Sequence, residues 1–341
     1  MAENLAIIAA AGSLKTETVI ERALKDPGKR VLITTYTREN LAQIIRRIEG
    51  RIGVVPANVS VMTWFSFLIS QAVRPYQCAV LDRIGFARGL NFKGKHQKFA
   101  KKEEAERYFF DSNRDIYRDG VSDFACIADA RAGGSVIGRL EQRFDHIYID
   151  EVQDLVGYDL EFLDLLFKSK IAVTVVGDPR QHTFSTNTSM KNKKYQGVGF
   201  LDWLKERSSS CDYEERSTSA RCSQEICDFA SMIFPEFDPL VSTRESSYGQ
   251  DGIHIVAQNN LESYVAKYRP KVLRHRRNVN TCGLEAINIG VSKGCTYDRV
   301  LIFPTKPMRA FIEDGDPGKL KAPEKLYVAA TRACYSVGFV I

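Results

Sequence analysis

Short apolar runs that alternate with amphipathic helical patterns constrain the fold of this chain more than any other feature. Residues 4–11, 30–37 and 59–64 are apolar runs typical of buried strands, and residues 17–26 and 38–52 between them have helical spacing. Parallel strands need a crossover, usually a helix, so this alternation predicts a parallel sheet covered by helices. The chain is therefore expected to have an α/β fold.

The alternation stops between residues 67 and 142. This stretch includes the charged segment 91–111, shows no strand pattern, and is expected to form a helical insertion. Beyond it the pattern resumes with strands at 146–150 and 171–178. From about residue 210 it predicts a second α/β unit, with a helix at 223–234 and strands at 252–257, 299–304 and 336–341.

Composition limits the functional classes only weakly. The 341 residues suggest about two domains, and the excess of 48 Lys and Arg over 42 Asp and Glu permits a nucleic-acid partner without requiring one. No apolar run approaches the roughly 18 residues that span a bilayer, and acidic Glu3 precedes the first apolar run. A cytoplasmic protein with no membrane partner is expected. The eight cysteines form no Cys-x-x-Cys pair, which argues against a zinc or iron–sulfur site.

The segment AAAGSLKT, residues 9–16, has the outline of a phosphate-binding loop. It follows a strand and precedes a helix, and Lys15 and Thr16 supply the ammonium for phosphates and the hydroxyl for Mg²⁺. Leu14 stands where such loops normally have Gly, a position whose backbone angles are often costly for other residues. Taken alone, the segment could equally be an accidental turn.

Two further strand ends carry polar residues suited to phosphate chemistry. Asp150 and Glu151 end the strand at 146–150, where one carboxylate can hold Mg²⁺ and the other can polarise a water molecule. The alternative is an acidic helix cap. Gln181 follows Gly-Asp-Pro after the strand at 171–178, and its amide can bond a γ-phosphate or its water, although Gly-Asp-Pro by itself is simply a turn.

The order of these and later blocks resembles the superfamily 1 helicases of the UvrD/Rep/PcrA type. The blocks are AAAGSLKT, TYTREN, MTWFSF, DEVQD, GDPRQHTF, ARCSQEI, VSKGCTYDRV and LYVAATRA. They occur in the family's order and span nearly the whole chain. The resemblance implies two RecA-like lobes built on parallel sheets. The first would comprise residues 1–66 and 143–209, the helical insertion residues 67–142, and the second lobe residues 210–341.

The resemblance also implies a role for each matching residue in ATP hydrolysis. Lys15 would contact the β- and γ-phosphates, and Thr16 and Asp150 would hold Mg²⁺. Glu151 would be the catalytic base, Gln181 would couple the γ-phosphate to DNA, and two arginines would act as arginine fingers. The remaining residues implied in ATP binding are Ala11, Gly12, Ser13, Leu14, Lys293 and Gly294. The two arginine fingers would be Arg221 and Arg332.

Aromatic and hydroxyl residues occupy the segments that line the family's single-strand groove. The implied DNA-binding residues are Thr35, Tyr36, Thr37, Trp64, Phe65 and Phe184. Core packing is the alternative for Tyr36 and Trp64. The basic runs 93–102 and 274–277 could touch phosphates, although such runs are usually solvated faces.

Several departures from the family pattern bear on function. Gly290 replaces a His, Thr296 replaces a Glu, and the residues after Phe184, STN, lack an aromatic and an Arg. The interval from Arg221 to Lys293 is too short for the family's large accessory subdomain. Few residues precede the first strand, where relatives carry a segment that reads adenine, so selectivity for ATP over GTP stays open.

The expected function is an ATP- and Mg²⁺-dependent DNA helicase or translocase, with 3′ to 5′ polarity as in the family. Its partner would be single-stranded DNA or a 3′-tailed duplex. The alternative is a nucleotide-dependent regulatory subunit that binds a nuclease in phage defence or repair. A P-loop kinase is poorly supported, because it leaves Arg221, Lys293 and Arg332 without a role.

Overall fold

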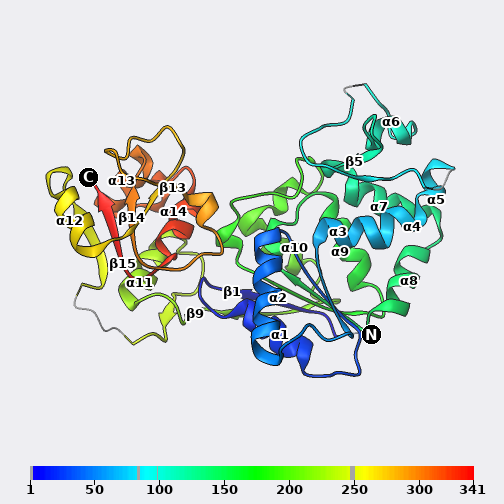
Figure 1. The fold of residues 1–341 in the computed structure, drawn as a ribbon, viewed down its shortest axis with the longest axis horizontal. Helices are drawn as coiled ribbons and strands as arrows, with labels where there is room; N and C mark the ends of the chain where they lie inside the picture. Colours follow the sequence, from blue (N-terminus) through cyan, green and yellow to red (C-terminus); the bar gives the residue numbers. More distant parts are fainter. Residues whose placement is uncertain (1–2, 83–84, 98, 246–249) are drawn as a thin grey trace. The chain divides into compact units, whose positions relative to one another are not determined.

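The computed structural model describes residues 3–82, 85–97, 99–245 and 250–341. The chain forms two compact units (Figure 1). The first contains Met1–Ile7, Thr16–Gly177 and Ser185–Glu214, and the second contains Ile8–Lys15, Asp178–Phe184 and Glu215–Ile341. The loops 8–15 and 178–184 therefore pack with the second unit, although the chain on either side of them belongs largely to the first.

The first unit is built on a sheet of six strands. Its pairs β2–β3, β2–β6 and β6–β7 are parallel, so the α/β fold class predicted from the alternation is confirmed. The inner strands are buried along most of their length because helices cover both faces. In order across the sheet the strands are β3 (Val59–Thr63), β2 (Val31–Thr35), β6 (His146–Asp150), β7 (Ala172–Gly177), β1 (Leu5–Ala9) and β8 (Asp212–Arg216).

Local signals define the helices of this unit. In α2 the Thr37 hydroxyl accepts from the Asn40 N–H at the start, and left-handed Gly53 (φ 83°) donates to the Glu49 carbonyl at the end. The predicted bounds 38–52 are therefore confirmed. The helices are α1 (Lys15–Leu24), α2 (Arg38–Ile52), α3 (Trp64–Leu68), α4 (Arg74–Tyr76), α5 (Cys78–Leu81), α6 (Ala105–Phe109), α7 (Val121–Arg131), α8 (Ser135–Arg143), α9 (Tyr158–Phe167) and α10 (Phe200–Lys205), with a π-helical turn at Ile69–Val73.

The insertion is not purely helical, which corrects the prediction for residues 67–142. Strands β4 (Gly89–Asn91) and β5 (Asp115–Tyr117) pair in parallel as a small separate sheet. Within 91–111 only α6 is helical. Asp111 organises the turn that leads into β5, since its carboxylate accepts from the Asn91 amide at 2.7 Å and from the Asp115 N–H at 3.0 Å. Lys98 of the basic run lies outside the described residues.

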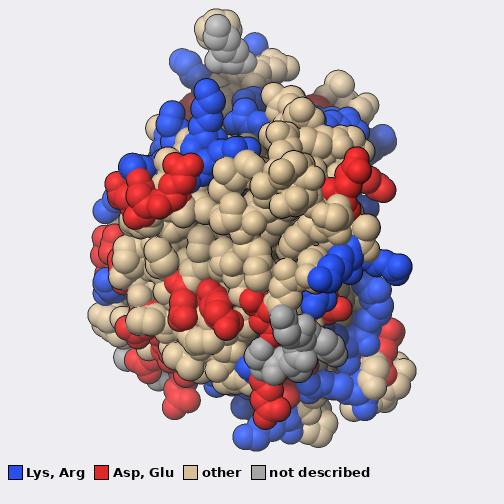
Figure 2. All heavy atoms as spheres, turned by 90° about the vertical axis from the view of Figure 1, so that its left-hand side faces the viewer, with Lys and Arg blue, Asp and Glu red and all other residues tan. Residues whose placement is uncertain are grey.

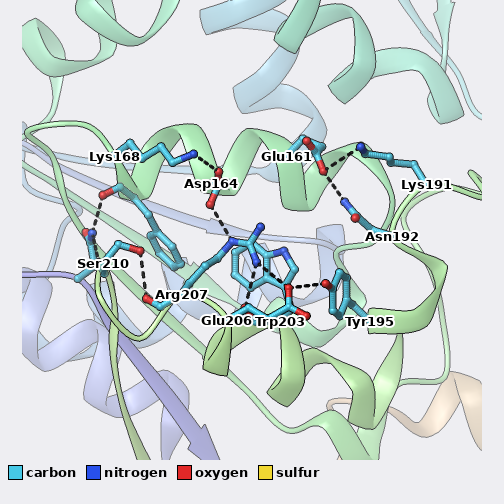
Figure 3. Close-up of polar contacts among 12 residues, drawn as sticks. Glu161, Asp164, Lys168, Lys191, Asn192, Tyr195, Trp203, Glu206, Arg207 and Ser210 are labelled. Carbon is cyan, nitrogen blue, oxygen red and sulfur yellow. Dashed lines mark hydrogen bonds and ion pairs between the residues drawn. The ribbon is translucent and has the colours of Figure 1, made fainter.

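A polar network holds α9 to the segment between strands β7 and β8 (Figure 3). The Asp164 carboxylate accepts from Arg207 Nε at 2.7 Å, and the Arg207 guanidinium stacks on the Trp203 ring, 4.0 Å from its centroid. One turn earlier on α9, Glu161 accepts from the Asn192 amide at 2.8 Å. These contacts hold residues 191–207, which contain only short helices, against α9 in the first unit.

The second unit has its own sheet of five strands, all paired in parallel. A buried cluster beneath α12 includes Val256, Leu261, Leu301 and Val340. The predicted second α/β unit is confirmed, although β14 and β15 begin two and three residues earlier than expected. In order the strands are β11 (Gly252–Val256), β15 (Ala333–Val340), β14 (Tyr297–Phe303), β12 (Lys271–Arg274) and β13 (Ile287–Asn288), with a separate pair β9 (Thr218–Ser219) and β10 (Val241–Ser242).

Four longer helices accompany this sheet, and its surface carries charges of both signs. On the face in Figure 2, basic side chains gather at the upper left and the lower right with acidic side chains beside them, and a broad uncharged area lies between. The helices are α11 (Gln224–Ile233), α12 (Leu261–Tyr268), α13 (Lys306–Asp314) and α14 (Pro323–Ala330). Across both units, 3₁₀ turns occupy Arg118–Gly120, Val152–Asp154, Pro179–Gln181, Lys193–Tyr195, Gly197–Gly199, Gln258–Asn260, Ile289–Ser292 and Pro317–Lys319.

Within the described ranges, no helix has both the length and the apolar character needed to cross a bilayer.

Candidate nucleotide and nucleic-acid sites

The loop after β1 is shaped around Gly12. Its φ is +80°, and a Cβ there would lie 2.6 Å from both the Arg221 Cβ and the Ser219 Oγ. Contacts that short do not occur between packed atoms, so only glycine fits. The Ala220 N–H also donates to the Gly12 carbonyl at 3.0 Å. The loop is thereby held against the segment that carries Arg221.

Leu14 adopts the left-handed conformation, with φ +60°. For a residue with a Cβ this costs about 1–2 kcal/mol. Its side chain is 58% exposed. The loop therefore keeps the backbone angle suited to glycine and tolerates the strain.

Lys15 begins α1 and turns back over the loop. Its Nζ donates to the carbonyls of Ala9 and Ala10, both at 2.9 Å. The ammonium thus lies at the loop that precedes a helix N-terminus, a combination that binds phosphate in many proteins. The Ser13 hydroxyl is buried without a hydrogen-bond partner among the described residues.

Thr16 and Asp150 meet in the first unit. The Thr16 hydroxyl donates to Asp150 Oδ2 at 2.8 Å, across 134 residues of sequence. Asp150 is buried at the carboxyl end of β6. A hydroxyl and a carboxylate are the hard oxygen donors that Mg²⁺ takes, so the donor chemistry of this pair fits that ion.

Glu151 is held in a strained backbone conformation, with φ +60°. Its N–H donates to Asp150 Oδ1 at 2.9 Å, and its carboxylate accepts from the Gln153 amide. Gln153 in turn packs on Gly177, where a Cβ would lie 2.4 Å from Gln153 Oε1. The Gln153 amide therefore holds the Glu151 carboxylate beside this strained turn.

A buried carboxylate organises the loop after β7. Asp178 accepts from Arg180 Nε at 2.7 Å, from Gln181 Nε2 at 2.9 Å and from the Tyr327 hydroxyl at 3.0 Å. Burial raises the pKa of Asp178, but Arg180, Lys15 and Gln181 together outweigh it and leave that pKa below its usual range. Asp178 is therefore a stable anion that orients Gln181.

Helix α14 and the residues after it bring two more groups to this cluster. The Tyr327 hydroxyl accepts from the Ala11 N–H at 3.3 Å, so one phenol joins the phosphate loop to Asp178. Arg332 Nη2 donates to Gln181 Oε1 at 2.8 Å, while its Nε and Nη1 donate to the carbonyls of Val328 and Cys295. The sequence blocks contained Asp178, Arg180 and Tyr327, but nothing in their local pattern singled them out.

Arg221 lies beside the same segment, because its Nη1 donates to the Thr331 carbonyl at 3.0 Å. Lys293 and Gly294 follow the turn Ile289–Ser292, and Gly294 has φ +86°.

A Cβ on Gly290 would lie 3.1 Å from Phe184 Cζ. The Phe184 ring therefore occupies the space that a histidine at 290 would enter, which accounts sterically for one departure from the family pattern.

A pocket of about 530 Å³ opens in the first unit, at the carboxyl ends of the neighbouring strands β2 and β3. Tyr36, Thr37, Arg38, Phe65 and Phe92 line it. The rings of Tyr36 and Phe65 have centroids 5.8 Å apart, and those of Phe65 and Phe92 are 5.9 Å apart. We refer to it as the aromatic pocket. Sequence reasoning missed Phe92, because it lies in the insertion.

Trp64 does not line this pocket and has the core packing that was the alternative to DNA binding. Its side chain is only 1% exposed and packs against Phe67 and Phe162. The indole N–H donates to Asp159 at 2.7 Å. Thr35 is likewise buried, 1% exposed at the end of β2. Neither side chain is available to a strand of DNA in this structure.

The residues that replace the family's aromatic and arginine after Phe184 have a structural role. The Thr186 hydroxyl and the Asn187 amide donate to Asp159, the amide at 3.0 Å, and the Ser122 hydroxyl also donates to it. Burial raises the pKa of Asp159 despite these donors. The substitution has therefore exchanged a stacking surface for a buried network that joins α7 and α9.

Comparisons with known proteins support a helicase fold. Residues 124–190 match the model of the UvrD/REP helicase N-terminal domain family. The crystal structure of Arterivirus nonstructural protein 10 (helicase) has a TM-score of 0.52 at 14% identity, over 99% of this chain and 59% of that one. The structure of the same Arterivirus protein in complex with DNA has a TM-score of 0.52 at 14% identity, over 99% of this chain and 61% of that one. No curated protein matches the chain in sequence.

The two parallel sheets give this chain the same fold as these helicases. The resemblance to UvrD-type helicases is confirmed by the family model over residues 124–190. The chain spans between 59% and 61% of the length of the viral helicases compared with it.

Proposed function

We propose that this chain is a nucleic-acid motor that hydrolyses ATP while bound to single-stranded DNA. The observation that carries the proposal is the continuous set of contacts from the Ala11 N–H through Tyr327, Asp178 and Gln181 to Arg332. Such a set gives the phosphate loop a direct link to an arginine, which is what a motor needs in order to sense nucleotide.

In the proposed reaction the amides of the loop and Lys15 hold the β- and γ-phosphates. Thr16 and Asp150 would hold Mg²⁺, which would supply positive charge to neutralise the phosphate oxygens. Glu151 accepts a proton from the attacking water. Arg221 and Arg332 disperse the charge that develops on the transferred phosphoryl group, since a planar guanidinium can bond two oxygens at once.

We place single-stranded DNA at the aromatic pocket of the first unit. Tyr36 and Phe65 offer ring faces for bases, and the Thr37 hydroxyl and Arg38 suit phosphates. Considered by itself, Phe184 of the second unit is 44% exposed and stays a predicted DNA-binding residue. One of the viral structures compared above is a helicase in complex with DNA, which supports a nucleic-acid partner for a chain of similar fold. A 3′-tailed duplex and 3′ to 5′ movement are the expected substrate and polarity.

A second candidate is a nucleotide-dependent regulatory subunit of a nuclease complex in phage defence or repair. The features that favour it are the strained Leu14 and the loss of polar coupling groups around Phe184 and Gly290. Such a protein would bind ATP tightly and hydrolyse it slowly, even with DNA present.

Phosphate release with and without oligo-dT, combined with calorimetric titration of Mg²⁺–ATP, separates the two candidates. A motor hydrolyses ATP faster with DNA, and Lys15→Ala abolishes both binding and turnover. Tight binding with slow, DNA-independent turnover identifies the regulatory subunit. No nucleotide binding by the unmodified protein would refute both.

A further inference from the structure

A buried carboxylate on α9, Asp159, collects hydrogen bonds from three other segments of the first unit. Oδ1 accepts from the Trp64 indole of α3 at 2.7 Å and from the Ser122 hydroxyl of α7. Oδ2 accepts from the Thr186 hydroxyl and from the Asn187 amide at 3.0 Å. We call these residues the Asp159 cluster. The carboxylate is their common acceptor, so it sets the positions of all three segments relative to α9.

On one side the Asp159 cluster adjoins the aromatic pocket. Trp64 and Phe65 are consecutive residues at the start of α3, and the Phe65 ring lines the pocket. Residues in one helical turn move as a body, since their backbone angles are fixed together. A ligand that displaces the Phe65 ring would therefore also displace Trp64 and its hydrogen bond to Asp159.

On the other side the cluster is bonded to the turn that carries Glu151. The Thr186 hydroxyl oxygen accepts from the Val156 N–H at 3.1 Å, and the Thr186 N–H donates to the Asp154 carbonyl at 3.0 Å. The Asp154 N–H donates in turn to the Glu151 carbonyl at 3.0 Å. The Asp159 carboxylate itself lies farther from the Val156 N–H, at 3.4 Å. Thr186 is thus the closest connection between the cluster and this turn.

Burial makes this connection stiff. The side chains of Asp159 and Thr186 are both 0% exposed, so water cannot replace a hydrogen bond that is lost there. Hydrogen bonds to a carboxylate are also stronger than those between neutral groups, and a buried donor left unpaired is costly. A small displacement of one donor is therefore expected to move the carboxylate and its other donors, and not to break the bond.

We propose that Asp159 and Thr186 are positioning residues that couple single-stranded DNA in the aromatic pocket to the Glu151 carboxylate. The inference rests on the proposed function, because it takes that pocket to hold the strand and Glu151 to be the base. A strand that stacks on Phe65 would shift α3, and the shift would reach the Glu151 turn through hydrogen bonds that lie within the first unit. Both positioning residues lie outside the eight sequence blocks.

The test compares the loss of two donors to the same carboxylate. Thr186→Val removes the hydroxyl that bonds both Asp159 and Val156, and nearly keeps the volume of the side chain. Ser122→Ala is the control, because it removes the donor that α7 supplies and leaves the bonds of Thr186 in place. Thr186→Ser keeps the hydroxyl and removes only a methyl group. Melting temperatures establish that each variant is folded.

Phosphate release from Mg²⁺–ATP would be measured without DNA and with saturating oligo-dT, and anisotropy would give the affinity for the oligonucleotide. In Thr186→Val the ratio of the two rates is expected to fall by about threefold or more, in line with substitutions along a coupled network. The rate without DNA should change little, because the turn keeps its own bond from Asp154 to Glu151. The affinity should also be unchanged, and Ser122→Ala and Thr186→Ser should keep the ratio.

An unchanged ratio in folded Thr186→Val would overturn the inference. An equal fall in Ser122→Ala would also overturn it, because any loosening of the Asp159 cluster would then have the same effect. If the rate without DNA falls as much as the rate with DNA, Thr186 has a structural role only.

A second variant covers the case in which Thr186→Val does not fold. Trp64→Phe breaks the same connection at the bond from the indole to Asp159, and should lower the ratio without changing the affinity for oligo-dT. An unchanged ratio in this variant would overturn the inference as well. If oligo-dT does not accelerate ATP hydrolysis by the unmodified protein, the proposed motor is refuted before any variant is compared.

Discussion

Arg332 Nη2 donates a 2.8 Å hydrogen bond to Gln181 Oε1, joining two residues that lie 151 positions apart in the sequence. The arginine is 2% exposed and also bonds two backbone carbonyls. Its guanidinium is therefore held in one orientation before any phosphate arrives. Asp178 in turn fixes Gln181. In the role of arginine finger proposed above, a guanidinium held in this way would lose little conformational entropy on meeting the transition state.

Arg332→Ala is expected to lower turnover by about 10³, the usual contribution of an arginine finger, with little change in nucleotide affinity. Single-turnover phosphate release and calorimetry measure the two quantities. If turnover is unchanged while the melting temperature falls, Arg332 has only the structural role that its carbonyl contacts support.

Tyr327→Phe removes one hydroxyl and both of its hydrogen bonds, to Ala11 and Asp178, while keeping the ring that packs against Phe234. Because a hydrogen bond to a charged group is worth about 1.5–3 kcal/mol, we expect kcat to fall by about tenfold or more. KM for ATP should change much less. The comparison variant is Tyr195→Phe, which removes a hydroxyl bonded to Glu206 in the first unit. Equal loss of kcat in both variants would argue against a positioning role for Tyr327.

Glu151→Gln should nearly abolish hydrolysis and leave ATP binding intact. The substitution keeps the shape of the strained turn but removes the proton acceptor, and loss of a general base costs about 10² to 10⁴ in rate. Turnover near that of the unmodified protein would exclude Glu151 as the base, and Asp150→Asn would then be the variant to examine.

Leu14→Gly should retain Mg²⁺–ATP binding or tighten it, because glycine adopts φ +60° without the strain that leucine has there. Gly12→Ala should do the opposite and abolish binding, since the added Cβ would overlap Ser219 and Arg221. Calorimetric titration distinguishes them. Binding that appears only in Leu14→Gly would mean that the natural loop is inactive.

Trp64→Phe should destabilise the fold without changing affinity for single-stranded DNA. It removes one donor from buried Asp159, which costs about 1.5–3 kcal/mol of unfolding free energy. Phe65→Ala, in the aromatic pocket, should instead weaken DNA binding by about 1–3 kcal/mol. Denaturant unfolding and anisotropy provide the two measurements, and a loss of DNA affinity in a stable Trp64→Phe would return Trp64 to the DNA-binding residues.

The sequence by itself determined features that depend on near neighbours. The bounds of helix α2 are predicted correctly because its start and stop signals, Thr37 and Gly53, act within one turn. The parallel sheets follow from apolar runs alternating with helical patterns, and the order of the motif blocks is enough to indicate the helicase class. Each of these signals is local, or is an order along the chain.

Only the tertiary structure decided which side chains meet. The motif that contains Trp64 predicts a place in the DNA groove, yet the donor requirement of buried Asp159 holds this side chain in the core. The short β4–β5 pair arises from the turn that Asp111 organises within the insertion, where no alternating pattern marks a strand. The contact of Tyr327 with Ala11 joins positions 316 residues apart. Burial and long-range hydrogen bonding decide which side chains come into contact. The free-energy cost of leaving a buried polar group unpaired depends on neighbours that only the folded chain supplies.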